Sequence, residues 1–217
     1  MSLHSKTSEL RSELRIVAAD DDTVLDLDPM QGLWTTEQYL RLTDGSRRML
    51  EFSGGSIEVL PMPTDKHQVI SRFIFLMMFP LVQSLGGTLL YAPIRLRIQE
   101  GKFREPDLLL LLDAHDPRRR NAYWLGADLV MEIVSPDDPE RDTRAKRLEY
   151  AEAGIPEYWI VDPEEETVTV LSLQTSQAAI RGSGRYAEEG IYRRGDTATS
   201  ILLPAFRVPV SDIFDAS

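Results

Sequence analysis

The sequence predicts a mixed α/β fold, an α+β protein built on a mixed sheet. Residues 108–112 are unbroken leucine, a pattern typical of a central strand covered on both faces. A strand pattern at 128–134, a charged helix pattern at 138–153 and a second strand pattern at 157–162 form a crossover unit. If those two strands are parallel in one sheet, the connection is right-handed. A long apolar helix pattern at 66–85 precedes them.

Length and composition are those of a globular domain. The chain has 217 residues, 42% of them hydrophobic and 27% charged. It has no cysteine, which excludes a disulfide framework, a thiolate metal site and a catalytic thiol. No apolar run is long enough to span a membrane and the N-terminus lacks a signal core, so we expect a cytoplasmic protein.

The charge distribution limits the kind of partner. The net charge of −11 counts against a broadly basic nucleic-acid-binding surface, but not against a local basic groove. Of the 24 cationic residues only four are lysine, among them Lys146. Lysine carries a compact ammonium, whereas arginine carries a planar guanidinium. A lysine in an arginine-rich chain therefore indicates a position that requires the compact ammonium.

The N-terminal part begins with a polar arm. We expect residues 1–30 to form an arm that is partly disordered, and residues 31–217 to form one domain. Residues 35–37 begin a short helix. Gly54-Gly55 lies between two strand patterns, at 49–53 and 56–60, and predicts a hairpin.

The remaining elements follow from local patterns. We expect Asp65 to cap the helix at 66–85, Pro80 to kink or interrupt it, and Gly86-Gly87 to end it. Further strands are predicted at 88–91, 94–98 and 167–173, a loop at 113–127, and a hairpin at 186–193 around Glu189-Gly190. The C-terminal tail has apolar anchors without a clear period.

Two carboxylates, Asp107 and Glu132, lie inside apolar runs. A buried charge costs several kcal/mol unless it is paired, protonated or bound to a metal. An antiparallel pairing of the two strands would place the start of the first beside the end of the second, and so Asp107 beside Glu132. We expect the carboxylates to converge to about 4 to 6 Å, within reach of one Mg²⁺ ion.

The following helix supplies a cation. Asp142, Lys146 and Tyr150 are spaced i, i+4 and i+8, on one helix face. If that face turns to the strand end, the Lys146 ammonium can orient an attacking water or stabilise charge on a phosphate.

An ordered set of motifs resembles one family. The set comprises Glu51 before the Gly-Gly turn, His67-Gln68, Pro106-Asp107, Glu132-Ile133-Val134-Ser135-Pro136, Asp142, Lys146, Tyr150, Glu157-Tyr158-Trp159-Ile160-Val161-Asp162-Pro163 and Asp212-Ile213-Phe214. It is similar to the Uma2 family, whose members are described as restriction endonucleases within the PD-(D/E)XK nuclease superfamily. The likeness covers most of residues 31–215.

The resemblance implies a fold and a site. It implies a restriction-endonuclease-like αβββαβ core, here with additional N- and C-terminal strands, and Asp107 and Glu132 as metal ligands. The superfamily's usual lysine position is Val134 in this chain, and the likeness implies that Lys146 replaces it. Glu51 and His67 would add a further ligand or a hydrogen bond.

The favoured hypothesis is an endonuclease that hydrolyses DNA with Mg²⁺, or alternatively Mn²⁺. We expect it to be a homodimer and to have no membrane partner. A basic groove is then expected near the site, lined by some of Arg95, Arg97, Arg104 and Arg118 to Arg120.

Other interpretations stay open. Asp107 would otherwise cap a strand, and Lys146 would be a solvated lysine paired with Asp142 or Tyr150. Arg118 to Arg120 would be a solvated loop. At the level of function, the alternatives are a non-catalytic nucleic-acid-binding or interaction module on the same fold and a hydrolase of another phosphate ester.

Overall fold

The computed structural model describes residues 15–17, 24–46, 48–136, 138–174 and 184–217, which group into two compact units, Met1–Pro61 and Met62–Ser217. The expected boundaries, an arm over 1–30 and one domain over 31–217, stay a prediction. Most of the arm, with its acidic run at 20–22, lies outside the described residues.

The first unit contains two strand pairs and one helix. Its elements are β1 (Arg15–Val17), β2 (Val24–Asp26), η1 (Asp28–Met30), α1 (Thr36–Gly45), β3 (Leu50–Ser53) and β4 (Ser56–Val59). Helix α1 begins where the sequence predicted, because Thr35 and Gln38 form a capping box. Tyr39 of α1 stacks on Phe52 of β3 at 5.0 Å and donates its hydroxyl to the Leu50 carbonyl. Helix and hairpin therefore share one small core.

The turn between β3 and β4 requires glycine. Gly54 and Gly55 have φ angles of 56° and 84°, in the left-handed region, and β3 pairs antiparallel with β4 as predicted. A Cβ on Gly55 would lie 2.5 Å from the Gly32 carbonyl oxygen. The Gly55 carbonyl accepts hydrogen bonds from the amides of Gly32 and Trp34, so this close approach holds the preceding loop in place.

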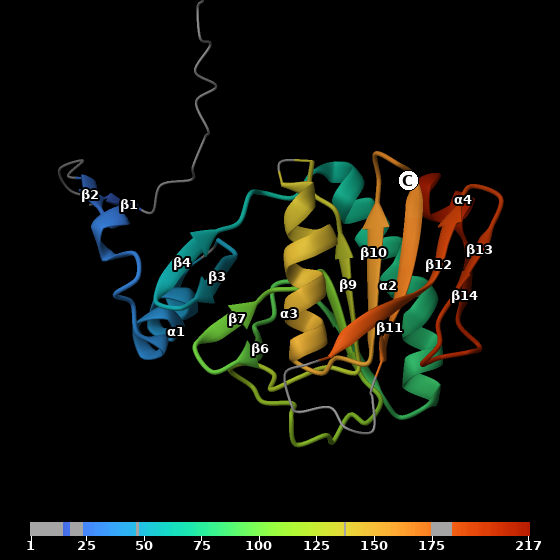
Figure 1. The fold of residues 1–217 in the computed structure, drawn as a ribbon, viewed down its shortest axis with the longest axis horizontal. Helices are drawn as coiled ribbons and strands as arrows, with labels where there is room; N and C mark the ends of the chain where they lie inside the picture. Colours follow the sequence, from blue (N-terminus) through green and yellow to red (C-terminus); the bar gives the residue numbers. More distant parts are fainter. Residues whose placement is uncertain (1–14, 18–23, 47, 137, 175–183) are drawn as a thin grey trace, which may run out of the picture. The chain divides into compact units, whose positions relative to one another are not determined.

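The second unit carries the large sheet (Figure 1). Its elements are α2 (Asp65–Ser84), β5 (Thr88–Tyr91), β6 (Leu96–Gln99), β7 (Lys102–Arg104), β8 (Leu108–Leu111), β9 (Leu129–Ile133), η2 (Arg141–Ala145), α3 (Lys146–Glu152), β10 (Glu157–Asp162), β11 (Thr167–Gln174), β12 (Arg185–Arg193), β13 (Thr197–Thr199), β14 (Arg207–Pro209) and α4 (Val210–Phe214). Six strands form one sheet in the order β12-β11-β10-β9-β8-β5.

That sheet is mixed, as the sequence predicted. β9 and β10 are parallel and are joined through η2 and α3, whereas the other neighbouring pairs are antiparallel. The expected antiparallel pairing of the leucine strand with the next strand is confirmed, with Leu108 opposite Met131. The mixed α+β class is therefore confirmed.

The two faces of the sheet are covered by different helices (Figure 1). Leu108 and Leu110 face a cluster that contains the buried side of α2, and Leu109 and Leu111 face a cluster that contains Tyr150 of α3. All four leucines are buried, which is why this strand has no polar position.

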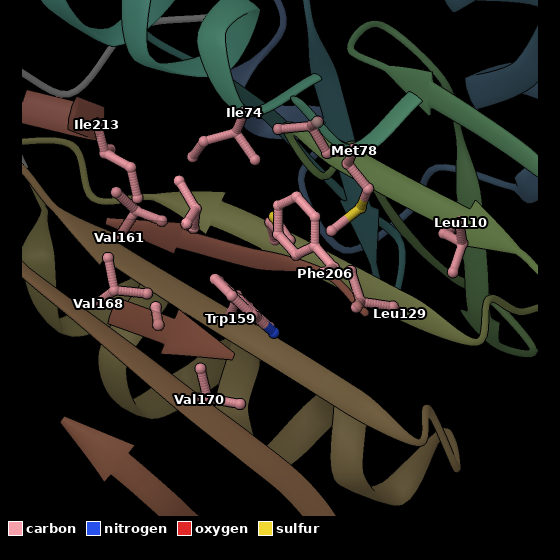
Figure 2. Packing of buried hydrophobic residues seen from close by; sticks show 14 of the residues in the cluster. Ile74, Met78, Leu110, Leu129, Trp159, Val161, Val168, Val170, Phe206 and Ile213 are labelled. Carbon is pink, nitrogen blue, oxygen red and sulfur yellow. The ribbon is translucent and has the colours of Figure 1, made fainter. Parts of the chain in front are cut away.

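The cluster on the α2 face also includes the C-terminal segment (Figure 2). Trp159 of β10 lies in its middle, with Ile74 of α2 on one side and Phe206 at 5.8 Å between ring centroids. The Trp159 indole donates to Glu157 Oε1 and the Leu202 amide donates to Glu157 Oε2, both at 2.5 Å. This buried carboxylate therefore ties the C-terminal segment to the sheet.

Several local predictions need correction. Thr64, not Asp65, caps α2, because its hydroxyl accepts from the His67 amide. The helix continues through Pro80 to Ser84, so the expected interruption is wrong, whereas the alternative, a kink at Pro80, stays a prediction. The predicted hairpin at 186–193 is wrong: these residues belong to one strand, β12, whose pairing with β11 shifts register between Val170 and Leu171.

The charged helix begins as a π-helical turn, η2, and continues as the shorter α3. Within the residues that the structure describes, no helix is long and apolar enough to cross a membrane.

An ionic cluster fastens α3 to β7. Glu149 accepts hydrogen bonds from Arg104 at 2.8 Å through each carboxylate oxygen, and Lys102 adds a third contact at 3.1 Å. Burial works to raise the pKa of Glu149, but the hydrogen bonds and charges of Arg104 and then Lys102 outweigh it and hold that pKa below the ordinary value of 4.5.

Glu149→Gln should lower the free energy of unfolding at pH 7 by about 1 kcal/mol, an amount limited by solvent screening of a half-buried pair. Because the folded-state pKa is lowered, this stabilisation is present above the unfolded pKa and is lost as the pH falls through the folded value. Urea unfolding of both proteins at pH 7 and pH 3 measures the difference. An equal difference at both pH values would contradict the ionic contribution.

Candidate functional site

Asp107 lies directly before β8, at the end of the strand that faces the end of β9. One carboxylate oxygen accepts a hydrogen bond from the Ile133 amide at 2.7 Å, and the other lies 2.9 Å from His67 Nε2. The pairing of Leu108 with Met131, continued by one residue, aligns Asp107 with Glu132. The two acids therefore occupy opposed positions on neighbouring strands.

Helix α2 brings His67 to this position. The residue lies in the first turn of the helix, where the Thr64 cap fixes the start. The side chains of His67 and Asp107 keep only 16% and 11% of their surface exposed. In this structure the hydrogen-bond partner of the His67 side chain is the Asp107 carboxylate.

Glu132 points from β9 toward α3. Its neighbours on the same face, Val130 and Val134, belong to the cluster around Tyr150, as strand alternation requires. Glu132 Oε1 accepts a hydrogen bond from the Tyr150 hydroxyl at 2.5 Å, and Oε2 lies 2.9 Å from Lys146 Nζ. Only 3% of the residue is exposed.

Lys146 joins Glu132 to a further acid. Its ammonium lies 3.0 Å from Asp142 Oδ1, one helical turn earlier, and the side chains of Lys146 and Asp142 are both 6% exposed. The Tyr158 hydroxyl donates to the Asp142 backbone carbonyl at 2.8 Å. Two buried carboxylates thus share one buried ammonium, the pairing that burial of charge demands.

The electrostatic environment acts on Tyr158. Burial raises the pKa of the Tyr158 phenol well above 10.0, and the carboxylates of Glu132, Asp142 and, more weakly, Asp107 raise it further. The phenol therefore stays protonated at neutral pH and can donate its hydrogen bond to the Asp142 carbonyl.

The structure forms two groups from the predicted site residues, Asp107 with His67 and Glu132 with Lys146. Glu51 lies on β3 in the unit Met1–Pro61, where it is fully buried, and its role stays a prediction. The spacing of Asp142, Lys146 and Tyr150 signalled their common face. No sequence signal indicated Tyr158 as a donor to Asp142.

Several arginines of the predicted groove are used within the fold. Arg104 pairs with Glu149, and Arg118 bridges Asp116 and Asp128 at 2.7 Å each. Arg97 lies 3.4 Å from Glu100. The basic groove stays a prediction.

The predicted metal ligands are the two strand acids, and both their role and their expected separation of about 4 to 6 Å stay predictions. Within the described part of the chain, no group of three or more His, Cys, Asp or Glu side chains is arranged to hold a metal ion. Asp107 and Glu132 offer carboxylate oxygens, the donors preferred by Mg²⁺, but both carboxylates accept hydrogen bonds from protein donors in this structure.

The sheet, the two covering helices and the buried acid–lysine group define a protein of the restriction-endonuclease-like fold class. The chain belongs to the Uma2 family, described as "Putative restriction endonuclease", whose model matches residues 36–211.

A solved structure supports the fold assignment. The chain is similar to the crystal structure of "a putative nuclease belonging to DUF820" from Anabaena variabilis, with 19% sequence identity and a TM-score of 0.63. The similarity covers 82% of this chain and 96% of that one, and at this identity it shows the fold alone. No curated protein matches the chain.

Tyr150→Phe should lower the free energy of unfolding by about 1.5 to 3 kcal/mol, because it removes a buried donor to a charged acceptor. Tyr186→Phe is the matched control: that hydroxyl donates to the neutral Ile155 carbonyl at 2.8 Å, and its loss should cost about 1 kcal/mol. Urea unfolding at pH 7 measures both. A smaller loss in Tyr150→Phe than in Tyr186→Phe would contradict a charge-assisted bond to Glu132.

Proposed function

We propose that the chain is a metal-dependent endonuclease that hydrolyses phosphodiester bonds in DNA. The observation that carries the proposal is the position of the Lys146 ammonium, which lies 2.9 Å from Glu132. Glu132 in turn occupies the strand position opposite Asp107. Membership of the Uma2 family and the fold shared with a protein described as a nuclease support the same activity.

The donor set fits a hard divalent cation. Mg²⁺ is held in such sites by one or two carboxylates, with water and substrate phosphate as the remaining ligands, so Asp107 and Glu132 suffice on the protein side. Mn²⁺ accepts the same oxygen ligands. When bound, the cation would supply Lewis acidity toward the phosphate and a more acidic water.

The protein's own residues then have distinct tasks. Asp107 and Glu132 would hold the cation, and His67 would orient the Asp107 carboxylate through its 2.9 Å contact. Lys146 would orient the attacking water or stabilise the negative charge that develops on the phosphate oxygens. Such an ammonium acts through charge and position.

The substrate and assembly are part of the same proposal. A DNA backbone approaching two acids needs cations around them, and the arginines expected to line a groove would supply these. A homodimer is the expected assembly, because one site per protomer allows each strand of a duplex to be cut.

One observation favours a second candidate. The oxygens of Asp107 and Glu132 already have His67, the Ile133 amide, Tyr150 and Lys146 as partners, so both carboxylates are held by protein groups without a metal ion. This arrangement suits a non-catalytic interaction module on the same fold.

Plasmid cleavage separates the two. We expect nicking and linearisation by the purified protein with Mg²⁺ or Mn²⁺ and none with EDTA. Asp107→Asn and Glu132→Gln should each reduce the rate by at least about 100-fold, and Asp128→Asn, which alters a carboxylate paired with Arg118, should leave it nearly unchanged. No metal-dependent cleavage of any DNA by the wild type would favour the non-catalytic module.

Lys146→Ala should reduce cleavage by about 100-fold while the protein remains folded, and Lys146→Arg should restore little, because the guanidinium is larger and planar. Circular dichroism and thermal unfolding of each variant control for structure. Full cleavage by Lys146→Ala would exclude a role for this lysine and leave only the two carboxylates.

A further inference from the structure

We propose that Asp142 is a positioning residue that holds the Lys146 ammonium against Glu132; the inference rests on the proposed nuclease function for its consequence in cleavage. Neither the family likeness nor the predicted ligand pair assigns a role to this acid. The proposal concerns the buried salt bridge of 3.0 Å between Asp142 Oδ1 and Lys146 Nζ.

The geometry makes Lys146 the bridge between two acids. Its Nζ lies 2.9 Å from Glu132 Oε2 and 3.0 Å from Asp142 Oδ1. The first carboxylate belongs to β9 and the second to η2. A lysine side chain has four rotatable bonds, so one contact leaves its end free to turn. Two contacts define where the ammonium lies.

Asp142 can act as an anchor because its own backbone is held. The Tyr158 hydroxyl, on β10, donates to the Asp142 carbonyl at 2.8 Å. Tyr158 packs edge-on against Tyr150 at 5.1 Å, and both rings are completely buried. The carboxylate therefore projects from a backbone position fixed by the rigid sheet.

The local helix geometry adds to this. Asp142 lies in the π-helical turn Arg141–Ala145, and Lys146 begins the α-helix that follows. A π-turn changes the direction of side chains at one point of a helix, and such turns are frequent at functional sites. Here it directs an acidic side chain into the protein, where only 4% of the residue remains exposed.

The energetics agree with a positioning role. A buried carboxylate that contacts neither substrate nor metal ion costs folding free energy unless a cationic side chain pairs with it. Asp142 meets that cost through the same ammonium that Glu132 uses. Without it, Lys146 would lose its ion pair with Asp142, and its position beside Glu132 would be less well defined.

The first arm of the test measures lysine reactivity by mass spectrometry after brief acetylation of the full chain. Of the four lysines, Lys146 is held by Asp142, whereas Lys102 is held by Glu149 of the same helix. Asp142→Asn should raise the Lys146 acetylation rate by about tenfold, the factor expected for a lost ionic hydrogen bond, and leave Lys102 unchanged.

Glu149→Gln is the matched control, because it removes an ionic partner from α3 without touching the site. It should raise the reactivity of Lys102 and not that of Lys146. Tyr158→Phe, which removes only the backbone anchor of Asp142, should raise Lys146 reactivity by about threefold, and Tyr186→Phe should not. These variants decide the question even if Asp142→Asn fails to fold.

The second arm measures DNA cleavage with Mg²⁺. Asp142→Asn should lower kcat by about 10- to 100-fold with KM for DNA within about twofold, as for other residues that orient an active group. Asp142→Asn combined with Lys146→Ala should cleave no more slowly than Lys146→Ala alone, because Asp142 acts through that lysine.

The outcomes are separable. An unchanged Lys146 acetylation rate in Asp142→Asn and Tyr158→Phe, or a double variant slowed by the full Asp142→Asn factor, would overturn the proposal. A wild type that cleaves no DNA would refute the proposed function, whereas the acetylation arm would still decide whether Asp142 holds Lys146.

Discussion

The burial of three charges in one apolar layer is the constraint on which this part of the structure depends. Glu132, Lys146 and Asp142 lie among valines and tyrosines, and each is less than a tenth exposed. Burying them apart would cost several kcal/mol per ion. One ammonium between two carboxylates leaves a net negative charge, and the hydroxyl of Tyr150 adds a neutral donor to Glu132. Docking of α3 with Lys146 facing the sheet supplies the counter-charge for both carboxylates.

The docking of α3 is therefore supported from several directions. The helix packs its apolar side, including Tyr150, on the sheet, and Glu149 on another side pairs with Arg104 and Lys102 of β7. The Tyr158 hydroxyl fixes the preceding turn through the Asp142 carbonyl. Rigid elements rather than a free loop thus carry the lysine, and such positioning is what a group acting by charge and orientation requires.

The end of a strand is where side chains from both faces of a sheet can meet. α2 on one face supplies His67 to Asp107, and α3 on the other supplies Lys146 to Glu132. Asp107 lies directly before β8, where its carboxylate accepts a hydrogen bond from the Ile133 amide of the longer neighbouring strand. Each acid therefore has a partner from a different helix, and the convergence of the two carboxylates stays a prediction.

Alternation and crossover order were readable in the sequence because they are local properties. The leucine run, the common face of Val130 and Glu132, and the i, i+4 spacing of Asp142 and Lys146 follow from strand and helix periodicity. Only the tertiary structure decided the contact of His67 with Asp107, the donation from Tyr158 to Asp142, and the single strand at Arg185–Arg193. Each of these features depends on how helices and strands that are distant in the sequence pack or pair with one another. Periodicity determines which way a side chain faces, whereas its partner from a distant segment is determined by packing of the whole core.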